Sequence, residues 1–228
     1  MTTIALFDID GTLLRAGGAG RKAVERALAE LIGRTPQETS LEAVKFAGRT
    51  DPWIVTQALA HYGVEYDEVL VDEIIARYVV HLPGELERSA QFEVLPGVRA
   101  LLAMLRDELG LMLGLGTGNV EPAAYAKLRR GNLDGFFHFG GFGCDHVERA
   151  RVLGKGRERG LAHHGVEEAR VVVIGDTPHD VAAAHAIDAY AVAVCTGRFD
   201  AATLRDAGAH LVVGDLQDVQ VRDVFHAS

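Results

Sequence analysis

Short apolar runs alternate with stretches of helical periodicity over most of the chain. Each run is uniformly apolar instead of alternating with polar residues, as is typical of strands buried on both faces of a parallel sheet. The runs that predict strands are Ile4–Phe7, Leu111–Leu115, Val171–Ile174, Ala191–Val194 and Leu211–Val213, with a weaker one at Phe136–Phe139. The segments that predict helices are Val98–Glu108, Pro122–Arg130, Arg151–His163, Val181–Ala186 and Asp218–Phe225. This order of elements predicts an α/β fold with a Rossmann-like, mainly parallel sheet.

One long interval breaks this alternation. Residues 16–89 carry helical patterns and no convincing strand, with amphipathic spacing over Arg21–Ile32 and a further helix over Val69–Val80. Because so long and so patterned a stretch is not a loop, we expect an all-helical cap subdomain inserted after the first strand. The chain then divides into an α/β core, residues 1–15 and 90–228, and a helical cap, residues 16–89.

Local signals mark a helix start and two hinges in this cap. Asp51 is expected as an N-cap, with Pro52 at the first helical position. Gly17-Gly18 and Pro83-Gly84 are the expected hinge points, since glycine and proline interrupt regular structure.

Charge and length narrow the class of protein. The 228 residues hold 23 Lys and Arg against 32 Asp and Glu, a net charge of −9. An acidic chain without a basic run is a poor partner for nucleic acid or an anionic membrane. No apolar stretch approaches the roughly 20 residues that span a bilayer. The first residues lack a basic segment before an apolar one, so secretion is not expected. The two cysteines, Cys144 and Cys195, form no CxxC motif, and we expect a cytoplasmic protein with free thiols.

The first candidate for chemistry is Asp8-Ile9-Asp10-Gly11-Thr12-Leu13, where the first expected strand ends. Residues i and i+2 of an extended chain point to the same side, so Asp8 and Asp10 face one site. Two close carboxylates repel each other unless a cation or a shared proton compensates. An Asp-Gly turn is the structural alternative.

The second candidate is Gly175-Asp176-Thr177-Pro178-His179-Asp180, which follows another apolar run. A turn leading into a helix brings Asp176 and Asp180 to one side, although Asp before Thr-Pro is also an ordinary helix cap. Two acidic pairs, each after a buried strand, fit one hard-cation site. Mg²⁺ prefers carboxylate oxygens and water, and a substrate phosphate usually completes its coordination.

The third candidate is the glycine-rich turn Gly114-Leu115-Gly116-Thr117-Gly118-Asn119. Glycines let the backbone approach a ligand, and the N-terminus of the next helix presents free N–H groups to an anion. Thr117 could donate its hydroxyl to such an anion, and Gly118 and Asn119 are the adjoining candidates for phosphate binding. A plain strand-to-helix loop is the alternative, and the turn alone does not decide between them. Ligands of open α/β sheets lie at the carboxyl ends of the strands, where all three motifs fall.

These motifs, in this order and spacing, resemble the haloacid dehalogenase superfamily: DxDGTL at residues 8–13, a Thr at 117 and GDTxxD at 175–180. The resemblance covers essentially the whole chain. The inserted helices are similar to the small helical cap of its phosphoglycolate phosphatase type. The resemblance implies an α/β core of that superfamily carrying a helical cap.

The same resemblance implies a role for each matching residue. Asp8 is expected to be the nucleophile that forms an aspartyl-phosphate, and Asp10 to protonate the leaving oxygen and then activate water. Thr117 is expected to bind the phosphoryl oxygens. The expected Mg²⁺ ligands are Asp8, the main-chain carbonyl of Asp10, Asp176 and Asp180.

One family element departs from the pattern. A Lys, often followed by Pro, usually precedes the third core helix, but here the sequence is Cys144-Asp145-His146-Val147-Glu148-Arg149-Ala150-Arg151. Arg149 occupies the matching place and could contact phosphate with two donors. Lys155, further along, is the second choice. A solvated helix residue is the alternative for either.

The cap is expected to set the substrate. Gly48-Arg49-Thr50-Asp51 begins a cap helix and offers Arg49, Thr50 and a helix N-terminus to an anionic substrate. A helix cap beside a solvated arginine is the alternative, and both stay open here.

Together these observations predict a Mg²⁺-dependent phosphatase that hydrolyses a small phosphomonoester, phosphoglycolate-like or a sugar phosphate. A phosphomutase of the same superfamily would use the same residues. A non-catalytic phospho-binding or receiver-like module is a rival, although receivers lack an inserted lid. The expected partner is a small phosphorylated metabolite, with no nucleic acid and no membrane, for a monomer or a homodimer.

Overall fold

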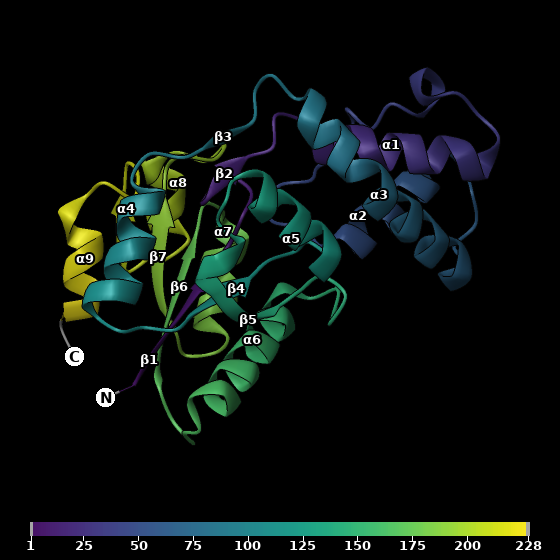
Figure 1. Cartoon of the computed structure of the whole chain (residues 1–228). Helices are drawn as coiled ribbons and strands as arrows, with labels where there is room; N and C mark the ends of the chain where they lie inside the picture. Colours follow the sequence, from purple (N-terminus) through teal and green to yellow (C-terminus); the bar gives the residue numbers. More distant parts are fainter. Residues whose placement is uncertain (1, 227–228) are drawn as a thin grey trace.

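Six parallel strands form the central sheet of the computed structural model, which describes residues 2–226 (Figure 1). The strands are β1 (Thr3–Phe7), β4 (Leu113–Gly116), β5 (Phe137–Gly141), β6 (Arg170–Gly175), β7 (Tyr190–Val194) and β8 (Leu211–Val213). Their spatial order is β5-β4-β1-β6-β7-β8, and every neighbouring pair is parallel. The predicted parallel α/β sheet is confirmed.

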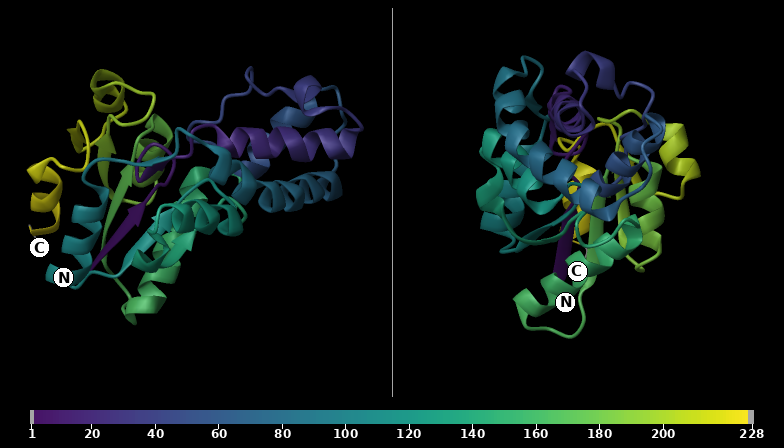
Figure 2. Two further views of the ribbon diagram at one scale, coloured as in Figure 1. Left: turned by 45° about the horizontal axis from the view of Figure 1, so that its top comes forward. Right: turned by 90° about the vertical axis from the view of Figure 1, so that its right-hand side faces the viewer.

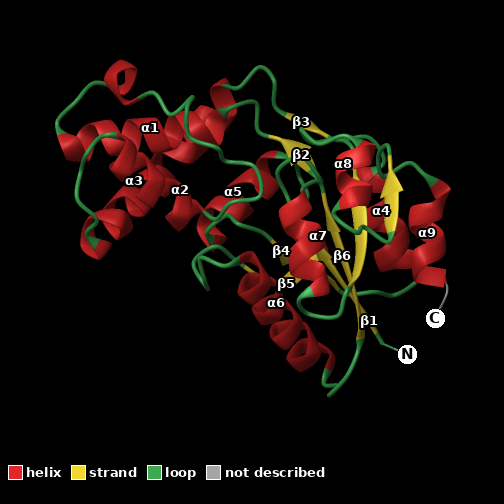
Figure 3. Ribbon diagram, turned by 180° about the vertical axis from the view of Figure 1, so that it is seen from behind, coloured by secondary structure: helices red, strands yellow, loops and turns green. Residues whose placement is uncertain are grey.

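Helices cover both faces of this sheet (Figure 3). They are α4 (Val98–Ala103), α5 (Glu121–Arg130) and α9 (Val219–His226) on one face, and α6 (Arg149–His164), α7 (Pro178–His185) and α8 (Ala201–Asp206) on the other. Along β1, Ala5 and Phe7 join the apolar cluster of α4, α5 and α9, whereas Ile4 and Leu6 join that of α6, α7 and α8. Both faces are buried, which explains the uniformly apolar runs.

Three local features differ from the expectation. The helix expected over 98–108 leaves α geometry after Ala103 and continues as a π-helical turn, Met104–Glu108. The six-residue α8 is too short to show a period and was not expected. A small antiparallel pair, β2 (Leu14–Arg15) with β3 (Glu93–Val94), joins the segments entering and leaving the inserted helices.

The inserted helices stand beyond one end of the sheet (Figures 1 and 2). They are α1 (Ala19–Ile32), the 3₁₀ turn Pro36–Thr39, α2 (Asp51–His61) and α3 (Glu68–Arg88). Most of their buried apolar side chains belong to the same apolar cluster as α4, α5 and α9. The insertion therefore packs against the core instead of standing apart from it. A further 3₁₀ turn, Asp134–Phe136, precedes β5.

Two expectations about this insertion are wrong. Pro83-Gly84 is not a hinge, because both residues lie inside α3. Tyr78, Leu82 and Leu86 lie four residues apart and are all buried, so one apolar stripe carries the helix through the proline. Asp51 is not the N-cap of α2, a position that Thr50 occupies; the Asp51 carboxylate is used elsewhere.

None of the helices within residues 2–226 is long and apolar enough to cross a bilayer.

Candidate active site

Three adjacent strands deliver the main candidate residues to one place. β1 lies between β4 and β6, and the strands end at Phe7, Gly116 and Gly175. The next residues along the chain are Asp8, Thr117 and Asp176, all of them buried. The strand order reverses at β1, and such a switch point is where open α/β sheets bind ligands.

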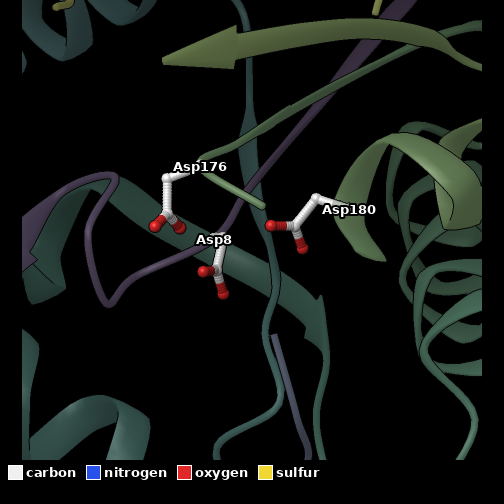
Figure 4. Close-up of side chains that lie close together, drawn as sticks. All are labelled: Asp8, Asp176 and Asp180. Carbon is white, nitrogen blue, oxygen red and sulfur yellow. The ribbon is translucent and has the colours of Figure 1, made fainter. Parts of the chain in front are cut away.

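Asp8, Asp176 and Asp180 form a buried triad of carboxylates, in which one oxygen of each lies within 4.8 Å of the others (Figure 4). Asp180 is held in place by a capping box on α7. Its Oδ2 accepts hydrogen bonds from the Thr177 hydroxyl at 2.8 Å and from the Thr177 amide at 3.1 Å. The helix cap that the sequence offered as the alternative reading is therefore present, but Thr177 is the cap and Asp180 still faces the triad.

Burial and mutual repulsion make the triad unfavourable when all three groups are charged. Burial raises the pKa of Asp8 to about 6, with Asp180 adding to the increase and Arg149 opposing it. Burial, followed by the charges of Asp8 and Asp180, raises the pKa of Asp176 to about 9. A bound cation would offset the repulsion among these carboxylates.

The donor set fits a divalent cation. Among the described residues, the carboxylate of Asp176 receives a single hydrogen bond, a long one of 3.5 Å from the Thr12 hydroxyl. Gly11 lets the backbone pass close to it, since φ is +88° and a Cβ would lie 2.4 Å from Asp176 Oδ2. A buried carboxylate with so few donors as Asp176 suits a hard ion such as Mg²⁺. Asp8, Asp176 and Asp180 could hold it.

Arg149 supplies the fixed positive charge of the site. It is the first residue of α6 and is buried. Its Nη2 lies 2.7 Å from Asp8 Oδ1 and 2.7 Å from Asp180 Oδ1, and its Nε lies 3.0 Å from the same Asp180 oxygen. Arg149 thus joins the two acidic motifs from a third element.

Lys155 is not brought to the site. Its ammonium group is partly exposed and pairs with the Glu158 carboxylate at 2.8 Å. It does not line the cleft that holds Asp8. The structure therefore distinguishes the two candidates that the sequence left open, and it places Arg149 beside Asp8.

Asp10 is not part of this triad but pairs with Lys127, a residue that no sequence motif marks. The buried Lys127 of α5 donates to Asp10 Oδ2 at 2.5 Å and to Asn119 Oδ1 at 2.9 Å. The signal was available: Ala123, Ala124, Lys127 and Leu128 share the buried face of one helix. A lysine on an apolar helical face is rarely buried without a partner.

The loop Thr117-Gly118-Asn119 meets the inserted helices directly. The Asp51 amide donates to the Gly118 carbonyl at 2.8 Å, and Asp51 Oδ2 accepts from the Val120 amide at 2.8 Å. A Cβ on Gly118 would lie 2.2 Å from the Arg49 carbonyl oxygen, so glycine permits this approach. Burial raises the pKa of Asp51 to about 6. The carboxylate predicted to cap α2 therefore bonds the loop of the core instead.

The two candidates in the cap segment differ in exposure. The Arg49 side chain is exposed, lines the cleft and stacks on Trp53, with 4.4 Å between the guanidinium carbon and the ring centroid. Thr50 is buried, and its hydroxyl donates to the Val147 carbonyl at 3.4 Å. Arg49 is therefore open to a ligand, whereas Thr50 joins cap to core.

The cleft between the sheet and the inserted helices has a volume of about 720 Å³. Asp8, Asp10, Thr117 and Asp176 form its floor, and residues of α1, α2 and α3 form its roof. Their convergence makes this cleft the candidate active site.

Comparison with known proteins places this geometry in a family. The model of haloacid dehalogenase-like hydrolases matches residues 2–188. The phosphoglycolate phosphatase of Pseudomonas putida is 28% identical over 218 residues, which is 94% of this chain and 77% of that protein.

Solved structures share the fold. A hydrolase from Pseudomonas syringae superposes with a TM-score of 0.70 at 23% identity and covers 100% of both chains. A predicted phosphatase from Clostridium acetobutylicum gives a TM-score of 0.71 at 20% identity, over 98% of this chain and 99% of that one. At these identities the likeness concerns the fold.

Proposed function

Because the chain belongs to the haloacid dehalogenase-like hydrolases, we propose that it is a Mg²⁺-dependent phosphatase acting on a small phosphomonoester through an aspartyl-phosphate. The observation that carries this proposal is the surroundings of Asp8. Its carboxylate lies in the cleft, 2.7 Å from the guanidinium of Arg149 and within the buried carboxylate triad. The substrate proposal draws on the relatives named phosphoglycolate phosphatase.

The chemistry runs in two displacements. An Asp8 oxygen attacks the phosphorus, the ester P–O bond breaks, and the leaving oxygen takes a proton from Asp10. Asp10, now ionised, takes a proton from water as the water oxygen attacks the same phosphorus. The bond to Asp8 then breaks, and inorganic phosphate leaves with the Asp8 carboxylate restored.

A carboxylate attacking a phosphate dianion meets charge repulsion. Mg²⁺ bound by Asp8, the Asp10 carbonyl, Asp176 and Asp180 would supply positive charge that offsets it. Arg149 orients Asp8 and offers guanidinium N–H groups to the phosphoryl oxygens. Thr117, Gly118 and Asn119 face the same cleft and would add hydroxyl and backbone donors.

The cap proposal concerns substrate choice. We assign residues 16–89 to the cap and the rest of the chain to the core. Arg49, exposed at the cleft, would contact the leaving group, which is the part of the substrate other than the phosphate. A roof of helices also fits an enzyme that must limit the access of water. Location in the cytoplasm and assembly as a monomer or homodimer stay predictions.

The test is a panel of phosphomonoesters, including 2-phosphoglycolate and several sugar phosphates, assayed for phosphate release with Mg²⁺ and with EDTA. We expect release that requires Mg²⁺ and disappears in Asp8→Asn. No metal-dependent release from any member would contradict the phosphatase proposal. Turnover that survives in Asp8→Asn would contradict the nucleophile alone.

A further inference from the structure

We propose that Lys127 is a positioning residue that holds the carboxylate of Asp10 in the cleft, so that this carboxyl group can exchange protons with the leaving group and with water. The inference rests on the proposed function, in which Asp10 is the acid and base. It concerns a residue outside the sequence motifs of the site.

The contacts of Lys127 single it out. Only 5% of its side chain is exposed, and its ammonium group bridges Asp10 Oδ2 at 2.5 Å and Asn119 Oδ1 at 2.9 Å. Burying an ammonium group is costly unless paired partners compensate. Its ion-pair partner within the described residues is Asp10, whose own side chain is 42% exposed. A buried cation is thus combined with a carboxylate that faces the cleft.

The position of Lys127 on α5 makes this contact rigid. Its neighbours Ala123, Ala124 and Leu128 are fully buried on the same face of the helix. Packing of that face fixes the origin of the lysine side chain, and Asn119 fixes its tip. Oδ2 of Asp10 is thereby held, and the other carboxylate oxygen is left to the cleft.

The two carboxylates of the first motif have different tasks and different cationic partners. Asp8 must act as a nucleophile and is held by Arg149, whereas Asp10 must move protons and is held by Lys127. Two cations from two helices, α6 and α5, thus orient two carboxylates that are two residues apart. Without Lys127, Asp10 would rotate freely and its distance to the leaving oxygen would vary. Loss of orientation lowers rate without removing any reacting group.

A purely structural ion pair makes a different prediction. It would lower stability and reduce turnover of every substrate by the same factor. A positioning role affects only the steps in which Asp10 gives or takes a proton. An alkyl phosphate needs that proton for its leaving oxygen, whereas 4-nitrophenolate leaves without one.

The experiment compares Lys127→Met with wild type in two single-turnover measurements, 4-nitrophenolate release and phosphoryl transfer from an alkyl phosphate that the wild type hydrolyses. We expect transfer from the alkyl phosphate to fall about 10²-fold, in the range of a lost general acid, and the 4-nitrophenolate step to change less than about threefold. Arg129→Met, an exposed change two residues along α5, is the matched control and should change neither step. Equal losses on both substrates, or no loss, would overturn the proposal.

A double-mutant cycle with Asp10→Asn tests whether Lys127 affects the rate through Asp10. If Lys127 acts through Asp10, Lys127→Met should add less than about a twofold loss in the Asp10→Asn background. A full additional loss would contradict the inference. Should Lys127→Met not fold, as judged by circular dichroism, Lys127→Gln serves in the same comparison. If the wild type hydrolyses no alkyl phosphate, the proposed function fails. That outcome is distinct from a failure of the Lys127 inference, which is tested only on a substrate that the wild type hydrolyses.

Discussion

The guanidinium of Arg149 bridges Asp8 and Asp180, with Nη2 2.7 Å from one carboxylate oxygen of each. These residues come from the end of β1, the start of α6 and the first turn of α7. One side chain thus fixes the relative position of the proposed nucleophile, Asp8, and a candidate metal ligand, Asp180. Because these groups are buried, removing the arginine leaves carboxylate charge uncompensated, which costs far more than breaking a surface pair.

Arg149→Ala should therefore lower kcat/KM for the preferred phosphomonoester by about 10²-fold or more, as when a donor to a developing anion is removed. Lys155→Ala is the matched control on the same helix and should leave kcat/KM within about twofold, since an exposed pair with Glu158 contributes little. Steady-state measurement of kcat/KM for both variants tests this prediction. The opposite order would return the phosphate contact to Lys155.

Mg²⁺ should stabilise the protein whether or not a substrate is present, because the triad oxygens gain a cation only in the folded state. At a free concentration of 100 Kd the gain is about 2.7 kcal/mol. Thermal unfolding with and without Mg²⁺ measures it. Asp176→Asn should reduce the increase in Tm, and an undiminished shift in that variant would place the ion elsewhere.

Gly118→Ala should loosen the contact between the cap segment and the core. The new Cβ would lie 2.2 Å from the Arg49 carbonyl oxygen, so the loop at 48–51 must move away. We expect a loss of about 1–3 kcal/mol in the free energy of unfolding, as for other overpacked sites, together with a higher KM.

Gly154→Ala is the control for that substitution. It lies inside α6 with open space around its Cβ position, so it should gain about 1 kcal/mol from helix propensity. Equal stability of the two alanine variants would show that the close approach at Gly118 is not rigid.

Asp51→Asn should change how stability depends on pH. Burial raises the pKa of Asp51 from 3.8 to about 6, so the folded state binds the proton more tightly than the unfolded chain. This contribution is present below about pH 4 and is lost as the pH rises through about 6, up to about 3 kcal/mol in all. Asparagine does not titrate.

Urea unfolding of wild type and Asp51→Asn at pH values near 4 and 7 tests this. The difference in the free energy of unfolding should shift in favour of asparagine on going to the higher pH. A difference that stays constant across the range would mean that Asp51 is not held in the folded state as a buried carboxyl group.

The pattern of apolar residues predicted the strands of the sheet, and the order of the motifs predicted which acidic residues lie at their ends. Uniform apolar runs at β1, β4 and β6 predict buried parallel strands, and the carboxyl ends of such strands must meet at one edge, which brings Asp8, Thr117 and Asp176 together. The sequence pattern did not predict α8 or the π-helical turn after α4, because short or irregular helices show no periodicity.

Tertiary packing alone decided which basic residues and which cap residues lie at the site. Whether Arg149 or Lys155 reaches Asp8 depends on where α6 begins, because one residue of shift turns a helical side chain by about 100°. Lys127 and Asp51 carry no motif, and their roles arise from α5 and the inserted helices meeting over the loop at 117–120. The sequence by itself determined which strands end at the candidate catalytic residues. Only the folded chain determined which basic residues and which cap residues lie beside them, because those contacts join segments more than 60 residues apart.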